Sequence, residues 1–232
     1  MQMQLSPPSY RAACALLAGL RGKAPPLASR WVGAALLTLL AACSTPAARV
    51  TVYDFGPGAS SPQAATRQAP LAPLLLAEVE APASLDSTAL LYRLLYADAQ
   101  QLRPYAQARW SMPAAQLLRQ RVREVLGQRR SVLSPLDAVA AGTLSLRLEL
   151  EEFSQVFDSA HSSAALVRVR ATLGRSGSPP KPLAQTVFVQ QQPSSSADAA
   201  GGARALALAS DALMAQLDTW LQQVAAAEAV AP

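Results

Sequence analysis

The chain has 232 residues, is 51% hydrophobic and 15% charged, and carries a formal net charge of +5. Four of its twenty basic residues precede position 43 and all fifteen acidic residues follow it, so residues 43–232 carry a net charge of only +1. The positive charge of the whole chain is therefore no argument for a nucleic-acid partner. Only two cysteines are present, Cys14 and Cys43, which excludes a framework of several disulfides.

An apolar run over residues 31–40 ends directly at Leu40-Ala41-Ala42-Cys43. Basic residues precede this run, and it is shorter than the ~20 residues that span a bilayer. A basic start, an apolar stretch and small residues at the cleavage point are typical of a secretory signal. The last four residues resemble the lipobox of bacterial lipoproteins, in which the cysteine is acylated and becomes the first residue. We therefore predict that residues 1–42 are a lipoprotein signal peptide and that Cys43 is lipidated.

Ser44 follows the predicted lipidation site. A residue other than Asp at this position resembles lipoproteins that are released to the outer membrane, with the inner membrane as the less favoured location. Residues 43–49 are expected to form a short tether, and residues 50–227 a single domain large enough to bury roughly 70% of its unfolded surface. Residues 228–232 are expected to be a disordered tail.

The strands are predicted from residue type and from alternation of apolar and polar residues. The first segment could instead be linker, and the third also fits a helical period. Between the first two lies a stretch rich in Gly, Pro and Ser, residues 56–72, which predicts a flexible surface loop. The expected strands are residues 50–55, 74–80, 89–95, 144–150, 167–173 and 183–190.

The fourth and fifth of these strands have polar faces of opposite charge. Glu149 and Glu151 follow the apolar positions of one strand, and Arg168 and Arg170 alternate with those of the other. Opposite charges across an antiparallel pair contribute about 0.2–1 kcal/mol each. The pattern favours an antiparallel hairpin.

Two amphipathic helices complete the predicted elements. Ser111 as a cap and Pro113 in the first turn mark the start of one, and Gly127 marks its end. The second extends over residues 203–227, with a stripe of leucines on one side. The predicted class is α/β, with a mixed, mainly antiparallel sheet and two helices packed on one face.

The order of short motifs behind the lipobox resembles the ABC-type transport auxiliary lipoproteins, which include PqiC-like proteins. The motifs are Val52–Phe55, Val79–Pro82, Leu85–Ser87, Leu91–Arg93 and Arg109-Trp110. The resemblance implies a fold similar to the N-terminal domain of TolB. It also implies that the chain works with an MCE-type (mammalian cell entry) substrate-binding protein and with the ATPase and permease of an inner-membrane ABC transporter. Such systems move phospholipid or other apolar solutes across the cell envelope.

No pattern in the sequence predicts catalytic residues, a cofactor or a metal site. His161 is the only histidine, and its neighbours Asp158 and Ser159 lie with it in an expected hairpin loop, where a triad rarely converges. A surface histidine is favoured over a catalytic base. Gly201-Gly202 lacks the spacing and the lysine of a phosphate-binding loop. Any ATPase must therefore be a separate subunit.

Arginines concentrate between residues 103 and 130. Two interpretations stay open: a solvated helix face, or a basic surface that contacts acidic lipid headgroups or an acidic partner. The residues of this candidate basic surface are Arg119, Arg123, Arg129 and Arg130.

Aromatic residues and arginines are interleaved between residues 92 and 110. They can belong to the core, where aromatic rings commonly pack, or to an interface with an MCE-type partner or a second copy of the chain. The candidate interface residues are Tyr92, Arg93, Arg103, Tyr105, Arg109 and Trp110.

The predicted function is a non-enzymatic, lipid-anchored periplasmic subunit of an MCE-type transport system, at the outer membrane. Two alternatives stay open: a structural envelope lipoprotein tied to cell-wall or Tol-like machinery, and a small lipid-binding carrier. A hydrolase is the least favoured functional prediction.

Overall fold

The computed structural model describes residues 49–58, 70–177, 179 and 181–230. The expected signal peptide, Cys43 and all of the tether except Arg49 lie outside these residues. So do residues 59–69, the middle of the expected surface loop.

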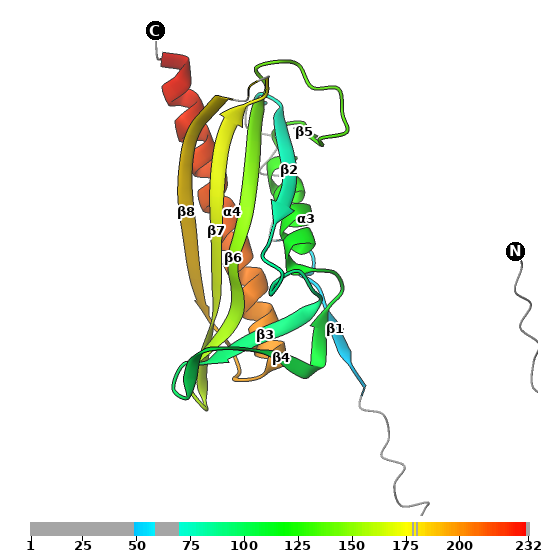
Figure 1. The fold of residues 1–232 in the computed structure, drawn as a ribbon, viewed down its shortest axis with the longest axis vertical. Coiled ribbons are helices and arrows are strands. Elements are labelled where there is room, and N and C mark those ends of the chain that lie inside the picture. Colours follow the sequence, from blue (N-terminus) through cyan, green and yellow to red (C-terminus); the bar gives the residue numbers. More distant parts are fainter. Residues whose placement is uncertain (1–48, 59–69, 178, 180, 231–232) are drawn as a thin grey trace, which may run out of the picture. The chain divides into compact units, whose positions relative to one another are not determined.

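Eight strands form one sheet, and two helices accompany it in the described part of the chain (Figure 1). The strands are β1 (Thr51–Tyr53), β2 (Leu74–Glu80), β3 (Ala89–Leu94), β4 (Asp98–Trp110), β5 (Val132–Leu133), β6 (Leu144–Ser159), β7 (Ser162–Arg175) and β8 (Lys181–Pro193). The helices are α3 (Ala114–Leu126) and α4 (Ala199–Val230).

The sheet is organised around the long strand β6. On one side β6 pairs with β7, and β7 with β8, both antiparallel. On the other side the first half of β6 pairs with β2 and its second half with β3, both parallel. β5 adds to β2 in parallel, β4 pairs with β3 antiparallel, and β1 runs parallel to the end of β4. Among the described residues four of seven pairings are parallel, so the sheet is mixed, as predicted, but the prediction that it is mainly antiparallel holds only for the β6–β7, β7–β8 and β3–β4 pairings.

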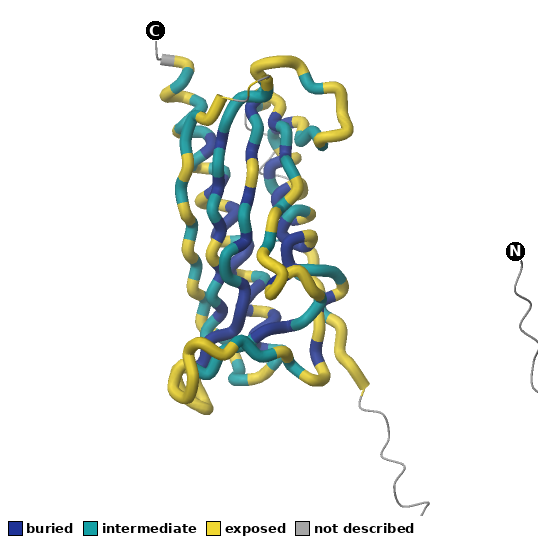
Figure 2. Tube along the Cα trace, viewed as in Figure 1, coloured by how far each residue is buried: buried dark blue, intermediate teal, exposed yellow. Residues whose placement is uncertain are grey.

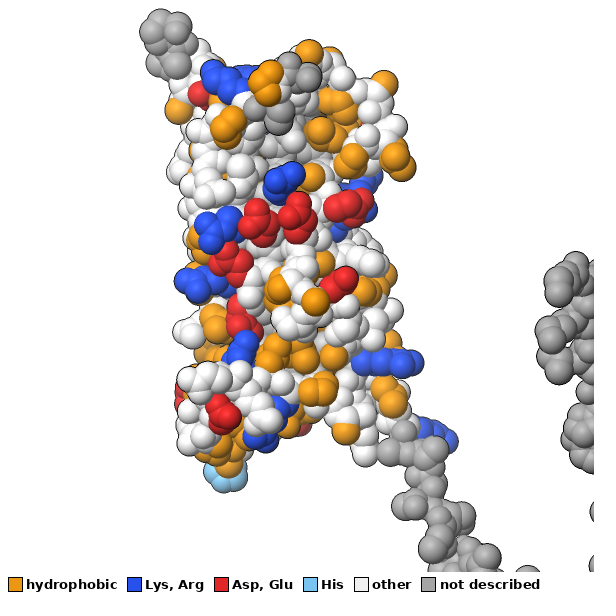
Figure 3. Space-filling view, viewed as in Figure 1, with side chains coloured by type: hydrophobic (Ala, Val, Ile, Leu, Met, Phe, Trp, Pro, Cys, Tyr) orange, Lys and Arg blue, Asp and Glu red, His pale blue; other side chains and the backbone are white. Residues whose placement is uncertain are grey.

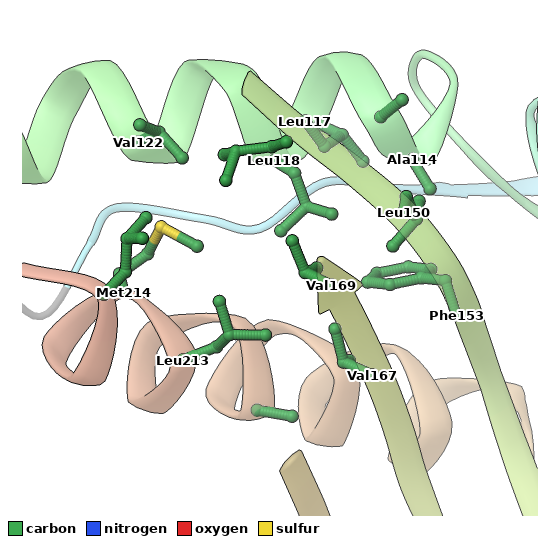
Figure 4. Close-up of a cluster of buried hydrophobic side chains, with 14 of the residues drawn as sticks. Ala114, Leu117, Leu118, Val122, Leu150, Phe153, Val167, Val169, Leu213 and Met214 are labelled. Atoms are coloured by element: carbon green, nitrogen blue, oxygen red, sulfur yellow. The ribbon is translucent and has the colours of Figure 1, made fainter. Parts of the chain in front are cut away.

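Both helices cover the same face of the sheet, as predicted. Alternate residues of β6 and β7 point toward them, because successive side chains of a strand face opposite sides. Figure 4 shows Leu117 and Leu118 of α3 directed toward Leu213 and Met214 of α4, with Val169 of β7 beside them. Figure 2 shows buried positions recurring along the long strands, between intermediate and exposed ones. Burying a leucine fully contributes about 1.5–3 kcal/mol, so this layer is the main source of stability.

The opposite face of β6 and β7 is charged (Figure 3). Glu149 and Arg170 are partners in the register, and the Arg170 Nη2 atom lies 2.5 Å from Glu151 Oε1. Arg168 Nε is 3.6 Å from Glu151 Oε2. These pairs confirm the predicted hairpin. Because their side chains are partly exposed, each contributes no more than about 1 kcal/mol.

Several element boundaries differ from the expectation. The strand predicted at residues 89–95 is confirmed over residues 89–94, whereas residues 98–110 form a 13-residue strand that was not predicted. The helix α3 begins after Pro113 without any side-chain cap bond, so the predicted capping role of Ser111 is wrong. Helix α4 continues to Val230, so residues 228–230 of the expected tail are helical. Residues 231 and 232 lie outside the described residues.

Candidate functional site

Residues 92–110 fold into the β3–β4 hairpin, which crosses the lower end of the molecule in Figure 1. Tyr92 of β3 stacks on Tyr105 of β4, with 4.7 Å between the ring centres, and meets Phe157 edge-on at 5.9 Å. The two tyrosines are therefore half-buried between the hairpin and the end of β6. They hold the hairpin to the main sheet instead of projecting from it.

A buried polar network lies behind this tyrosine pair. The Tyr105 hydroxyl donates to Gln155 Oε1 at 2.8 Å, and Gln155 Nε2 donates to the hydroxyls of Ser163 at 2.7 Å and Ser194 at 3.4 Å. Gln155 is fully buried. Burial raises the pKa of Tyr105, reinforced by Tyr92 and by Asp198, so the phenol stays protonated and keeps donating.

Gly202 at the start of α4 allows the helix to reach this network. A Cβ atom on Gly202 would overlap Gln155 Oε1 and Cδ. In the sequence, Gly202 was compared only with the glycines of a phosphate-binding loop, and its packing role was not predicted. Gln155 was missed as well, because a lone glutamine in a strand carries no signal of burial.

The arginines of the hairpin have different environments. Arg93 Nη2 lies 3.0 Å from Glu152 Oε2 on β6, and Nη1 donates to the backbone oxygen of Gln100 at 3.2 Å. Arg103 Nε donates to Gln101 Oε1 at 2.8 Å. Arg109 is exposed and forms no ion pair with the described residues. Arg93 and Arg103 thus make contacts within the chain, and Arg109 is the arginine of the candidate interface most available to a partner.

Trp110 does not belong to a surface. Its side chain is 1% exposed and packs against Phe55 and Phe153, with ring centres 5.6 and 5.7 Å away. The alternation of β4 explains the correction, since Ala108 and Trp110 face the helices and Arg109 faces outward. Trp110 is a core residue, and its inclusion in the candidate interface is wrong.

The candidate basic surface is divided by ion pairs. Arg119 Nη1 lies 2.8 Å from Glu78 Oε1 on β2, and Arg130 Nη2 lies 3.2 Å from Asp218 Oδ1 on α4. Burial lowers the pKa of Arg130, and Asp218 opposes that shift. Arg129 Nη1 donates to Gln222 Oε1 at 3.3 Å. Of the four arginines only Arg123 is exposed, so they do not form one continuous basic face.

Three of them nevertheless share an open groove at the end of α3. The groove has a volume of about 650 Å³ and is lined by Arg123, Arg129 and Arg130 together with residues 127–128, 131–132 and 70–71. Its guanidinium groups could hold an anionic group, since arginine suits carboxylate and phosphate. It lies toward the end of the molecule opposite the β3–β4 turn (Figure 1).

Among the described residues the most deeply buried arginine is Arg121, which is not one of the predicted site residues. Its side chain is 2% exposed, and Nη2 donates to the backbone oxygens of Phe55 and Gly56, both at 2.9 Å. Nε lies 3.3 Å from Asp211 Oδ1 on α4, and Nη1 lies 3.4 Å from Glu124 Oε2. Arg121 therefore joins the segment after β1 to both helices.

The described residues bring no catalytic groups together. His161 is exposed in the β6–β7 turn, where its backbone N–H donates to Ser159 Oγ at 3.3 Å. Within the described ranges, no three His, Cys, Asp or Glu side chains are placed to hold a metal ion. None of the described helices has the length and apolar character needed to cross a membrane.

The fold is similar to that of two solved structures. One is protein XCC0632 from Xanthomonas campestris, of family DUF330, with a TM-score of 0.64, 22% identity, and coverage of 78% of this chain and 100% of that one. The other is an uncharacterized protein with a TM-score of 0.55, 13% identity, and coverage of 75% and 99%. At these identities the likeness concerns the fold alone. A comparison with curated proteins found no match.

At the level of sequence families, the description that matches is ABC-type transport auxiliary lipoprotein component, over residues 53–218. The matched range begins at the last residue of β1 and ends within α4, so it includes β2 to β8, all of α3 and the first part of α4. It covers more than half of the chain. The chain therefore belongs to the ABC-type transport auxiliary lipoprotein component family.

Proposed function

We propose that the chain is held on the periplasmic face of the outer membrane by acyl chains on Cys43. There it works with an MCE-type substrate-binding protein and an inner-membrane ABC transporter that move phospholipid or another apolar solute. The observation that carries the proposal is the family match over residues 53–218, which makes the chain an auxiliary lipoprotein of an ABC-type transport system. The lipobox at Leu40–Cys43 supports the anchor. The similarity to the TolB N-terminal domain stays a prediction.

A non-enzymatic role is supported by where the reactive side chains lie. His161 is on an exposed turn, where the Ser159 hydroxyl accepts a hydrogen bond from the His161 backbone N–H. General acid–base and nucleophilic catalysis need partners within hydrogen-bond reach. A His161→Ala chain should therefore restore a deletion strain fully. Loss of function with an intact fold would favour a hydrolase.

The alternative of a lipid-binding carrier receives no support from the groove at the end of α3. A carrier needs a mostly apolar cavity that encloses its ligand. The groove is open, and its lining includes three arginines. We therefore favour a role through contacts with partner proteins.

The direct test is affinity purification of the full-length tagged chain from membranes of its native host. The proposal expects an MCE-type protein, an ATPase and a permease to co-purify in detergent. The matched control is the same chain with Cys43→Ser, which should remain unprocessed or be lost from the outer-membrane fraction. Recovery of cell-wall or Tol-like proteins without the transporter would favour the structural envelope lipoprotein.

Membrane fractionation of Cys43→Ser also tests the anchor by itself. Two lipid signals are enough for stable membrane attachment, so three acyl chains on the native cysteine should hold the chain firmly. An unmodified Cys43 in a chain that still fractionates with the outer membrane would contradict the anchor, whatever proteins co-purify.

A further inference from the structure

Two pairs of exposed apolar side chains, one at each end of β4, lie on the end of the molecule where the described chain begins. The described residues include eight large hydrophobic side chains that are exposed. Four of them are at this end: Val50 just before β1, Val52 in β1, and Leu95 and Tyr96 in the β3–β4 turn. Figure 1 shows β1 and this turn at the same end, and Figure 3 shows hydrophobic side chains on that end. We call these four residues the apolar rim.

The structure of the turn keeps its two apolar side chains outside the core. Leu95 N–H donates to the Phe157 backbone oxygen at 2.9 Å, and Ala97 N–H donates to the Leu94 oxygen at 3.0 Å. These bonds hold the turn against the end of β6 while Leu95 and Tyr96 remain 42% and 53% exposed. On β1, Val52 lies opposite Arg109 in the register, on the face away from the core, and is 50% exposed. The exposure is thus fixed by hydrogen-bonded backbone.

The length of the chain before the described residues limits what can lie against this end. Five residues lie between Cys43 and Arg49, the first described residue, and an extended chain over these six residue-to-residue steps reaches ~20 Å. A membrane that holds acyl chains on Cys43 must therefore lie within that distance of Arg49. The apolar rim is on the same end as Arg49.

We propose that the apolar rim inserts into the surface of the leaflet that holds the acyl chains of Cys43. This inference rests on the lipidation in the proposed function. Tyrosine is enriched at membrane interfaces, where its ring lies among headgroups and its hydroxyl meets water, and leucine and valine enter the apolar region beneath. The rim orients the domain on the membrane, with the groove of Arg123, Arg129 and Arg130 directed away from it.

The charges near the turn indicate which lipids the rim contacts. Asp98 and Asp158 are exposed beside the β3–β4 and β6–β7 turns, and Arg93 is paired with Glu152. Among the described residues no basic cluster lies at the β3–β4 turn to attract anionic headgroups, whereas the exposed Arg49 and Arg109 flank Val50 and Val52 at β1. The contact at the turn is therefore apolar and made with neutral lipid, and anionic lipid should not strengthen it at Tyr96.

The test uses the full-length chain, processed and lipidated in cells. Because the mature chain contains no cysteine except Cys43, whose thiol carries lipid in the proposed function, one introduced cysteine can be labelled alone with an environment-sensitive nitrobenzoxadiazole dye. Tyr96→Cys and Val50→Cys report on the rim. Leu136→Cys is the matched control, because Leu136 is 96% exposed in the loop between β5 and β6, at the opposite end of the molecule.

Each labelled chain is reconstituted into vesicles of equal parts phosphatidylcholine and phosphatidylethanolamine, with and without doxyl-labelled phosphatidylcholine. The inference expects dye at positions 96 and 50 to emit at shorter wavelength and to be quenched by doxyl lipid. Dye at position 136 should show neither change. Replacing part of the neutral lipid by phosphatidylglycerol should not increase quenching at position 96.

Each other outcome overturns the inference in a distinguishable way. A chain that floats with the vesicles but shows equal, water-like emission at positions 96 and 136 overturns membrane contact and leaves the anchor intact. A chain that does not float overturns the anchor and the inference together. Quenching that grows with phosphatidylglycerol assigns the contact to arginines. A blue shift at position 96 only after transporter proteins are added makes the rim a protein interface.

Discussion

Arg121 is a buried charge whose removal should destabilise the fold strongly. It is buried, it carries charge, and it links two backbone oxygens after β1 to Asp211 on α4. Removing one partner of a buried ion pair leaves the other groups unsatisfied and costs up to 3–5 kcal/mol. Because Asp211 is partly exposed, we expect Arg121→Met to cost about 2–4 kcal/mol, measured by urea unfolding. Arg123→Met, two residues away on the exposed face, should change stability by less than about 0.5 kcal/mol.

The cost of Arg121→Met should depend on pH. Burial raises the pKa of Asp211 above its ordinary value of 3.8, and Arg121 opposes that shift. Without Arg121 the pKa should rise further. A carboxyl whose folded pKa exceeds its unfolded value loses stability as the pH rises through the folded pKa. The difference between native and variant should therefore be larger at pH 7 than near pH 4, and an equal difference at both would contradict the role of Asp211.

Gly202 gives a second prediction, because its effect should change sign with its neighbour. In the native chain Gly202→Ala places a methyl group on the buried Gln155 and should cost about 1–3 kcal/mol. In a Gln155→Ala background the overlap is gone, and alanine is the better helix former by about 0.5–1 kcal/mol. A double-mutant cycle of unfolding free energies measures the coupling. Additive effects would show that Gly202 meets some other group.

Arg121 could have been found from the sequence, unlike Gln155. It stands four residues after Leu117 and four before Val125, on the apolar side of α3, so helical periodicity already places it inward. A grouping of the arginines between residues 103 and 130 by charge alone leaves this inward position unnoticed. Gln155 lies in a part of β6 where both faces are covered, and no alternation distinguishes it there.

At the scale of elements, the two helices begin in different ways. Asp198 precedes α4 and accepts from Gly201 N–H at 2.7 Å and from Ser196 Oγ at 2.8 Å, whereas α3 has no side-chain cap bond. We expect Asp198→Ala to cost about 1 kcal/mol and Ser111→Ala to cost almost nothing. Thermal unfolding of both variants compares them, and equal losses would contradict this account.

The Asp198 effect should also vanish in acid. The bond from Gly201, followed by that from Ser196, lowers the pKa of Asp198 below 3.8. A carboxyl whose folded pKa is lowered contributes stability above its unfolded pKa and loses it as the pH falls through the folded pKa. The difference between native and Asp198→Ala should thus be present at pH 7 and decrease as the pH falls below 3.8.

Element prediction succeeded where one face of a strand is buried and the other is charged. β2 begins at the predicted residue, and β6 and β7 show the predicted alternation of buried and exposed residues. The opposite charges of β6 and β7 correctly predicted that these two strands form an antiparallel hairpin. It failed at β4, whose residues 98–110 include three glutamines and a proline and show little alternation. Residues 98–110 form a strand because they pair with β3 and β1. A local sequence pattern does not contain these tertiary contacts. The parallel pairing of β2 and β3 along one strand is likewise a tertiary property.

At the scale of the whole molecule, the two ends differ in chemistry. The apolar rim and the start of the described chain share one end, and the groove lined by Arg123, Arg129 and Arg130 is near the other. The charged outer face of β6 and β7 lies between them and satisfies its own charges. A partner that approaches from the opposite membrane would meet the arginine-lined end first.

Arg109 provides the cleanest test of a partner surface. The sequence predicts both Arg93 and Arg109 as interface residues. Arg93 forms an ion pair with Glu152, so Arg93→Glu would place two carboxylates side by side. A loss of binding in that variant could therefore reflect unfolding. Arg109 is exposed on the outer face of β4, and Arg109→Glu should change stability by less than about 0.5 kcal/mol. If this face contacts the MCE-type partner, Arg109→Glu reduces co-purification while the melting temperature stays unchanged, because a reversed charge at an interface repels its counterpart. Gln107→Ala, on the same face two residues earlier, is the control and should co-purify normally. If Arg109→Glu co-purifies with every partner at the native level, this face is not the interface. The groove around Arg123 is then the next surface to test.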